Sequence, residues 1–315
     1  MAQCTRLAAP CGAEVTGIDA TAPLAPEVAQ QLRDWLLQHG LLIVRGQNLS
    51  KQQQVEFSRV FGKLAIHPLA HQVDPEAPEL LVLDSHGKSG DMTPENPEEI
   101  SAAIDWHTDL AYVTKPNYAG LLHGKILPPE DGLTGFIDRH ATYDSLPAEL
   151  KARIAGLTVV QSWRHSQESI SRNPAFRTDE GAKVLDLDLF PDLGFPLALE
   201  HPISGRTILN VSNMWSSEVI EMPGDEGKSL LKQLLEHSTH EKFIYWHSYC
   251  AGDVVIWDNY RMLHAASGTK GKYRRQLYRT TIEGEAELGS LPIDSEAVAA
   301  AEQRIAALRK EKVGL

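Results

Sequence analysis

The spacing of three potential metal ligands constrains the fold of this chain most strongly. His107 and Asp109 form a His-x-Asp pair, and His264 stands alone far beyond them. Two histidines and one carboxylate in this order are the sequence form of a facial triad, which binds a ferrous ion by one face and leaves three coordination positions open. The fold must therefore bring two distant segments together around one metal, which is typical of non-haem iron oxygenases.

The His-x-Asp pair has a simpler explanation as well, because a chain with 13 histidines contains such a pattern easily by chance. On a β-strand, however, side chains at i and i+2 point to the same face, as two ligands of one metal require. Imidazole and carboxylate suit Fe(II), but also Zn and Mn. We expect Trp106 and the apolar residues after Asp109 to form a dry wall beside the metal.

His264 follows an expected strand at 254–257 and a turn, so we expect it at a strand exit. The alternative is a histidine bonded only to backbone. Arg275 and Arg279 are an even number of residues apart, so on one strand they would share a face. Two inward guanidinium groups are costly unless they pair with anions. We interpret those anions as carboxylates of a co-substrate and a substrate. A basic turn is the alternative for Arg275.

The composition is that of a soluble globular protein, and 315 residues suffice for one large domain or two small ones. The net charge of −12, from 30 basic and 42 acidic side chains, argues against a nucleic-acid partner. Three cysteines form no disulfide framework and indicate a reducing compartment. No signal peptide or membrane-spanning run is visible, so we expect a cytoplasmic protein without a membrane partner.

Hydrophobic periodicity and turn residues predict a mixed fold. Helices are expected at 25–40, 50–61, 143–154, 225–237 and 295–312, and strands at 41–44, 80–83, 208–210, 243–246, 254–257 and 277–282. Helices early and strands late favour an α+β fold with a β-sheet core braced by helices. We expect a single domain over 1–315, in which the polar, glycine-rich or irregular segments 85–105 and 163–195 are candidate lid loops.

Many short segments carry a resemblance to a known family. They lie at 12–19, 61–62, 67–68, 106–109, 132–134, 141–143, 201–202, 252–253, 257–259, 264 and 275–284. In order and spacing they resemble the TauD/TfdA family, the taurine and 2,4-dichlorophenoxyacetate dioxygenases that depend on Fe(II) and 2-oxoglutarate. The resemblance implies a double-stranded β-helix, or jelly roll, with flanking helices. It also implies oxidation of a C–H bond with O2, most simply hydroxylation, with release of succinate and CO2.

The resemblance assigns the metal and co-substrate residues. It implies that His107, Asp109 and His264 bind the iron. Thr134 matches the threonine that bonds the far carboxylate of 2-oxoglutarate, and Arg275 matches the arginine that forms a salt bridge to the same group. Halogenation is disfavoured, because halogenating relatives normally replace the carboxylate ligand that Asp109 supplies here.

The resemblance also sketches a substrate site. Arg279 matches an arginine that holds the substrate's acidic group in relatives, and His67 matches a substrate-side histidine of the taurine enzyme. Asn213 and Trp215 follow a strand that lines the pocket in relatives, although packing alone is an equal explanation for Trp215. We therefore expect a small-molecule substrate with an acidic group. Desaturation or another oxidative rearrangement is an alternative outcome, a non-catalytic jelly-roll binding protein is another reading, and a homo-oligomer is left open.

Three departures from the family pattern bear on the substrate. The family usually reads Gly-Gly-Asp-Thr where this chain has Asp131, Gly132, Leu133 and Thr134. The taurine enzyme has a tyrosine at the position of Ala70 and an asparagine at the position of Ala103. Only half of a sulfonate pocket is therefore present, and taurine is not the expected substrate.

Overall fold

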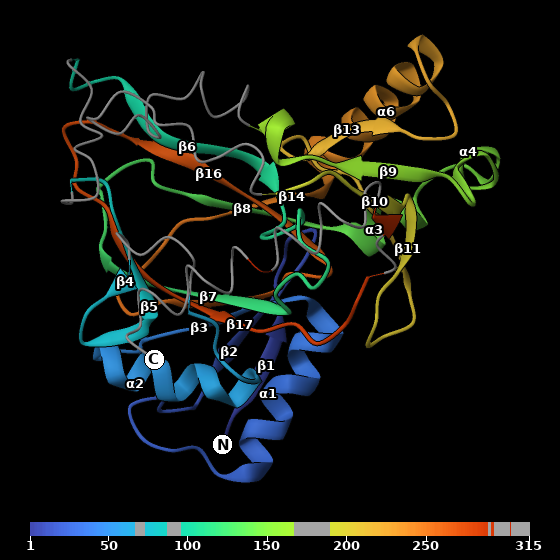
Figure 1. Ribbon diagram of the computed structural model, residues 1–315. Coiled ribbons are helices and arrows are strands. Elements are labelled where there is room, and N and C mark those ends of the chain that lie inside the picture. The colour runs from blue at the N-terminus through green and yellow to red at the C-terminus, as the bar shows by residue number, and fades with distance from the viewer. Residues whose placement is uncertain (67–72, 87–95, 167–189, 289–290, 293–302, 304–315) are drawn as a thin grey trace.

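The computed structural model describes all residues except 67–72, 87–95, 167–189, 289–290, 293–302 and 304–315. Its core consists of two sheets that lie one above the other (Figure 1). The larger sheet has the order β1 (Gln3–Arg6), β2 (Ala13–Thr16), β3 (Leu41–Val44), β15 (Val254–Asp258), β7 (Ala119–Ile126), β17 (Gln276–Ile282), β5 (Ala77–Asp84) and β4 (Val73–Asp74). The smaller sheet has the order β14 (Ile244–His247), β8 (Thr134–Asp138), β16 (Met262–Lys270) and β6 (Ile100–His107). Flanking helices and mostly antiparallel sheets agree with the α+β fold that the sequence pattern predicts and with the jelly roll that the family resemblance implies.

Two helices cover the outer face of the larger sheet (Figure 1). Helix α1 (Pro26–His39) ends at Gly40, whose φ of 73° lets its N–H bond the carbonyl of Leu36. Helix α2 (Lys51–Ser58) begins with a capping box between Ser50 and Gln53, and the short 3-10 helix η1 (Arg59–Phe61) extends it. The helices predicted at 25–40 and 50–61 are therefore confirmed.

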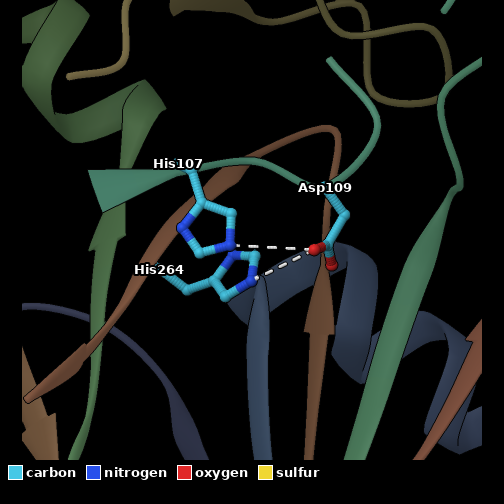
Figure 2. Close-up of side chains that lie close together, drawn as sticks. All are labelled: His107, Asp109 and His264. Atoms are coloured by element: carbon cyan, nitrogen blue, oxygen red, sulfur yellow. Dashed lines mark ion pairs between the residues drawn. The ribbon is translucent and has the colours of Figure 1, made fainter. Parts of the chain in front are cut away.

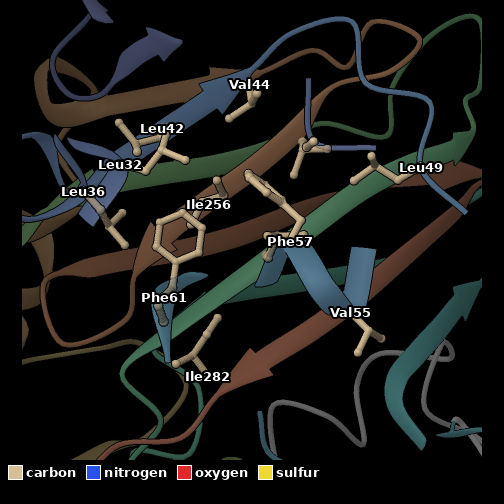
Figure 3. Packing of buried hydrophobic residues seen from close by; sticks show 14 of the residues in the cluster. Leu32, Leu36, Leu42, Val44, Leu49, Val55, Phe57, Phe61, Ile256 and Ile282 are labelled. Atoms are coloured by element: carbon tan, nitrogen blue, oxygen red, sulfur yellow. The ribbon is translucent and has the colours of Figure 1, made fainter. Parts of the chain in front are cut away.

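The main core lies between these helices and the larger sheet (Figure 3). Leu32 and Leu36 of α1 are fully buried, and burial of each contributes about 1.5–3 kcal/mol. Side chains alternate along the central strands: Ile256 of β15 and Ile282 of β17 join this core, whereas Trp257 and Leu277 belong to a cluster on the inner face. The alternation directs odd-numbered β17 residues toward the space between the two sheets.

A second region packs beside the two sheets. It contains a sheet of order β13 (Ser216–Val219), β9 (Thr158–Gln161), β10 (Leu193–Pro196) and β18 (Leu291–Pro292), and the pair β11 (Ala198–Glu200) and β12 (Thr207–Leu209). Its helical elements are α3 (Arg139–Asp144), α4 (Ala148–Ile154), α6 (Asp225–Ser238) and η5 (Glu241–Phe243). None of the helices formed by the described residues has the length and apolar character needed to cross a membrane.

The structure corrects several sequence predictions. The helix expected at 143–154 is two helices, because Pro147 is extended (ψ 146°) and disfavours helical backbone in the residue before it. The candidate lid at 85–105 is too long, since residues from 100 onward form β6 and pair with β16. The end of the candidate lid at 163–195 belongs to β10, while 167–189 lies outside the described residues. The helix expected at 295–312 also lies outside them, apart from residue 303.

Candidate active site

The three expected metal ligands converge between the sheets (Figure 2). His107 is the last residue of β6 and pairs in register with His264 of β16. Asp109 Oδ1 lies 3.8 Å from His107 Nε2 and 3.5 Å from His264 Nε2. Their ligand atoms all lie within 4.8 Å of one another, and the three residues are buried. In the described part of the chain they are the one group of three such side chains close enough to hold a metal ion.

The protonation states of His107 and Asp109 are those that metal binding requires. The Nδ1 of His107 lies 2.7 Å from the carbonyl oxygen of Asp105, which only accepts, so Nδ1 carries the proton and Nε2 presents its lone pair. Burial, with repulsion from His264, lowers the pKa of His107 to about 3 and keeps its imidazole neutral. Burial alone would raise the pKa of Asp109, but Arg279 and His264 hold it well below its ordinary value, so the carboxylate is ionised.

Two of the three ligands lie elsewhere than the sequence predicts, which is a position on the strand of His107 for Asp109 and a strand exit for His264. Asp109 lies in the turn after β6, and His264 lies within β16 rather than at a strand exit. Asn259 holds that turn, because its Oδ1 accepts from the backbone N–H of Asp109 at 2.9 Å and its Nδ2 donates to the Asp109 carbonyl at 3.0 Å. Trp215 Nε1 donates to the carbonyl of Thr108 at 2.8 Å. Hydrogen bonds from distant segments therefore fix the turn that carries Asp109, which we call the ligand turn.

Aromatic rings wall the site, but Trp106 is not among them. It packs against Trp246 at 5.3 Å, in a cluster with Leu263 on the face opposite His264. The expectation that Trp106 forms a dry wall is therefore wrong, because neighbours on a strand point to opposite faces. Trp257 supplies that wall, with its ring 4.9 Å from the ring of His264.

Thr134 and Arg275 lie together in a second part of the site. Arg275 Nε donates to the Gly132 carbonyl at 3.0 Å, and its Nη2 lies 3.3 Å from Thr134 Oγ1. Gly132 and the preceding Asp131 both have positive φ, 66° and 62°. The altered turn therefore keeps a left-handed backbone even where the family's glycine is replaced. Burial lowers the pKa of Arg275, and among the described residues no carboxylate pairs with its guanidinium.

Arg279 has an ionic partner within the protein. Its Nη2 lies 2.5 Å from Asp109 Oδ2, so the oxygen of Asp109 that does not face the histidines is held by a guanidinium. The guanidinium carbon lies 5.7 Å from the centre of the Trp257 ring. Its Nε is buried and has no hydrogen-bond partner among the described residues. The sequence predicts external anions beside both arginines, but the structure places the protein's own Asp109 beside Arg279.

An aromatic cluster lies next to the metal ligands, formed by Tyr112, Trp163, Phe190 and Trp215. The Tyr112 ring lies 4.6–4.8 Å from each of the other three rings. Burial and the Asp109 carboxylate raise the pKa of Tyr112, so its hydroxyl remains protonated. Trp215 thus packs and also supports the ligand turn.

Of the two remaining residues predicted on the substrate side, the structure describes Asn213 but not His67. Asn213 Oδ1 is buried without a hydrogen-bond partner in the described structure, and His67 lies outside the described residues. Sequence reasoning missed Tyr112, Asn259 and Tyr249, whose hydroxyl lies 3.2 Å from Thr134 Oγ1. Tyr112 lies three residues after Asp109 in the sequence, and this closeness was a signal for its place at the site. The Trp-Asp-Asn motif at 257–259 was a signal for Asn259. Tyr249 had no local signal.

Comparison with known proteins identifies the family. A family model described as taurine catabolism dioxygenase TauD, TfdA family, matches residues 3–281. The alpha-ketoglutarate-dependent 2,4-dichlorophenoxyacetate dioxygenase of Burkholderia sp. (strain RASC) is 30% identical over 267 residues, which cover 83% of this chain and 87% of that protein. The (S)-phenoxypropionate/alpha-ketoglutarate-dioxygenase of Sphingobium herbicidovorans is 27% identical and covers 87% and 92% of the two chains.

A solved structure confirms the fold. The crystal structure of a taurine dioxygenase from Burkholderia xenovorans superimposes with a TM-score of 0.74 at 28% identity, over 95% of this chain and 98% of that one. The relatives from Burkholderia sp. (strain RASC) and Sphingobium herbicidovorans are named for alpha-ketoglutarate. Alpha-ketoglutarate is another name for 2-oxoglutarate, the co-substrate that the family resemblance implies. The chain belongs to the TauD/TfdA family and is an alpha-ketoglutarate-dependent dioxygenase.

Proposed function

We propose that this enzyme uses ferrous iron to hydroxylate a C–H bond of a small organic acid with an apolar, aryl-sized body. The observation that carries the proposal is the convergence of His107, Asp109 and His264 within 4.8 Å, beside a cationic site formed by Arg275 and Thr134. A decayed, non-catalytic jelly roll would have no reason to keep these five side chains. Iron and 2-oxoglutarate, when bound, supply the oxidising chemistry: O2 is consumed, succinate and CO2 are released, and the substrate is oxidised.

The protein's own residues position the reactants. The Nε2 atoms of His107 and His264 and one oxygen of Asp109 would hold the iron by one face. Arg279 keeps the other Asp109 oxygen occupied, which favours binding of the metal through a single carboxylate oxygen and leaves positions open. Arg275 and Thr134 would hold the far carboxylate of 2-oxoglutarate through charge-assisted hydrogen bonds.

Two features support a substrate that has an acidic group and an apolar body. Arg279 has a buried Nε–H without a partner among the described residues, and a substrate carboxylate or sulfate would satisfy it. The cluster around Tyr112 provides apolar wall beside the ligand turn, as a ring or alkyl chain requires. The relatives named for phenoxy acids have substrates of this shape, which makes aryloxy acids the first class to test.

Succinate release measured against a panel of acids tests the proposal. The panel contains aryloxyacetates, 2-aryloxypropionates, alkyl sulfates, amino acids and taurine, each with Fe(II), 2-oxoglutarate and O2. We expect an aryloxy acid to stimulate succinate release and to yield an oxidised product by mass spectrometry. Stimulation by taurine alone would contradict the substrate proposal, and a product lighter by two hydrogens would show desaturation instead of hydroxylation.

A further inference from the structure

We infer that Tyr249 is a third binding residue for the co-substrate and selects 2-oxo acids that end in a second carboxylate. The inference rests on the proposed co-substrate site at Arg275 and Thr134 and adds to it a residue from a separate segment. The known family pattern in this chain places only the arginine and the threonine at that carboxylate.

Strand pairing brings Tyr249 to the site. His247, the last residue of β14, pairs in register with Thr134 of β8, and Tyr249 follows two residues later. Its hydroxyl lies 3.2 Å from Thr134 Oγ1, and its ring centre lies 5.7 Å from the guanidinium carbon of Arg275. Tyr249, Thr134 and Arg275 therefore present an O–H, an O–H and a guanidinium to one place, from three segments distant in sequence.

The chemistry of a carboxylate matches these donors. An ionised carboxylate accepts about four hydrogen bonds. The Arg275 fork supplies up to two of them, the Thr134 hydroxyl supplies one, and the Tyr249 hydroxyl supplies another. Burial raises the pKa of Tyr249, so its hydroxyl keeps its proton at neutral pH and acts as a donor. A 2-oxo acid without a distal carboxylate would leave the Arg275 guanidinium with neutral partners alone, and a partly buried charge without an anion is costly.

Neighbouring side chains fix the Tyr249 ring before any ligand binds. The His247 ring lies 4.6 Å from it at an interplanar angle of 78°. His247 is itself held, because its Nε2 lies 3.1 Å from Asp253 Oδ2 and its Nδ1 lies 3.0 Å from the Tyr245 hydroxyl. A donor that is already oriented loses less entropy on binding, so the hydroxyl can contribute to affinity rather than only to packing.

The test uses Tyr249→Phe, which keeps the ring and its contact with Arg275 and removes only the hydroxyl. Manganese-loaded protein is titrated calorimetrically with 2-oxoglutarate and with 2-oxopentanoate, which has the same chain length but no distal carboxylate. We expect the Kd for 2-oxoglutarate to rise about tenfold while that for 2-oxopentanoate stays unchanged. Tyr273→Phe is the matched control, since its hydroxyl bonds Glu130 on the surface, and both of its Kd values should equal those of the wild type.

Three outcomes would overturn the inference. Wild-type affinity of Tyr249→Phe for 2-oxoglutarate would leave the tyrosine with packing alone. Equal weakening of both 2-oxo acids would indicate general damage to the site rather than loss of carboxylate recognition. Failure of the wild-type protein itself to bind 2-oxoglutarate would refute the proposed co-substrate site, and the Tyr249 role with it.

Discussion

Replacement of Arg275 with glutamine should weaken 2-oxoglutarate binding by about a hundredfold. The side-chain nitrogens of Arg275 meet neutral acceptors, the Gly132 carbonyl and the Thr134 hydroxyl, so the positive charge is available to a ligand. A carboxylate about 4 Å away gains about 4 kcal/mol at an effective dielectric constant of 20. Glutamine would retain about 1 kcal/mol through a neutral hydrogen bond. The remaining difference of about 3 kcal/mol corresponds to roughly a hundredfold in Kd.

The same substitution should not destabilise the free protein. A partly buried cation without an anion costs free energy, so its removal should leave the Tm of the ligand-free protein equal to or above that of the wild type. Calorimetric titration of manganese-loaded protein with 2-oxoglutarate measures the first effect, and thermal unfolding without ligand measures the second. An unchanged Kd would refute the charge argument and transfer the role to Arg279. A clear drop in Tm would show that Arg275 is mainly structural.

Three further predictions concern positioning, stability and reactivity. Asn259→Ala should weaken Mn(II) binding about tenfold, because two hydrogen bonds to the Asp109 backbone are lost, and unchanged affinity in a metal titration would mean that the turn holds itself. Asp138→Asn should lower the free energy of unfolding in urea by about 3 kcal/mol, because the Arg261 guanidinium, bonded to Asp138 at 2.9 and 2.6 Å, would lose its buried anion. Burial alone would raise the pKa of Asp138, but Arg261 holds it below its ordinary value. The stabilisation by this ion pair is therefore present above about pH 4 and is lost as pH falls through the lowered pKa. If the free energy of unfolding of Asp138→Asn showed the same pH dependence as that of the wild type, this assignment would be contradicted. Burial raises the pKa of the Cys11 thiol to about 12, so at pH 8 it should resist thiol reagents until the protein unfolds, and labelling as fast as that of an exposed cysteine would contradict its burial.

Local signals in the sequence sufficed for much of the fold. Gly40 after an apolar stripe and Ser50 before a helix each mark an end that the structure reproduces within a residue. The continuous apolar run at 254–257 forms a central strand buried on both faces. These features depend on residues near one another in the chain, so periodicity and capping preferences capture them. The division of the helix at Pro147 was also readable, because proline restricts the preceding residue.

The site was only partly accessible from the sequence, because its geometry depends on long-range contacts. Residue types and the family pattern indicated the three ligands, but the position of Asp109 in a turn depends on Asn259, 150 residues away. The pairing of Arg279 with Asp109 depends on how β17 lies opposite the ligand turn. Tyr249 reaches Thr134 only through the register of β14 with β8. No local pattern encodes such pairings.

The central claim is that His107, Asp109 and His264 hold the metal that acts with 2-oxoglutarate. Succinate release by a variant that lacks one of these metal ligands tests this claim most directly. The rate is measured with Fe(II), 2-oxoglutarate and O2 for the wild type, for His107→Ala and for His240→Ala, a change at an exposed histidine outside the site. We predict that His107→Ala releases no succinate above the protein-free background, while His240→Ala matches the wild type. Release by His107→Ala at the wild-type rate would contradict the account.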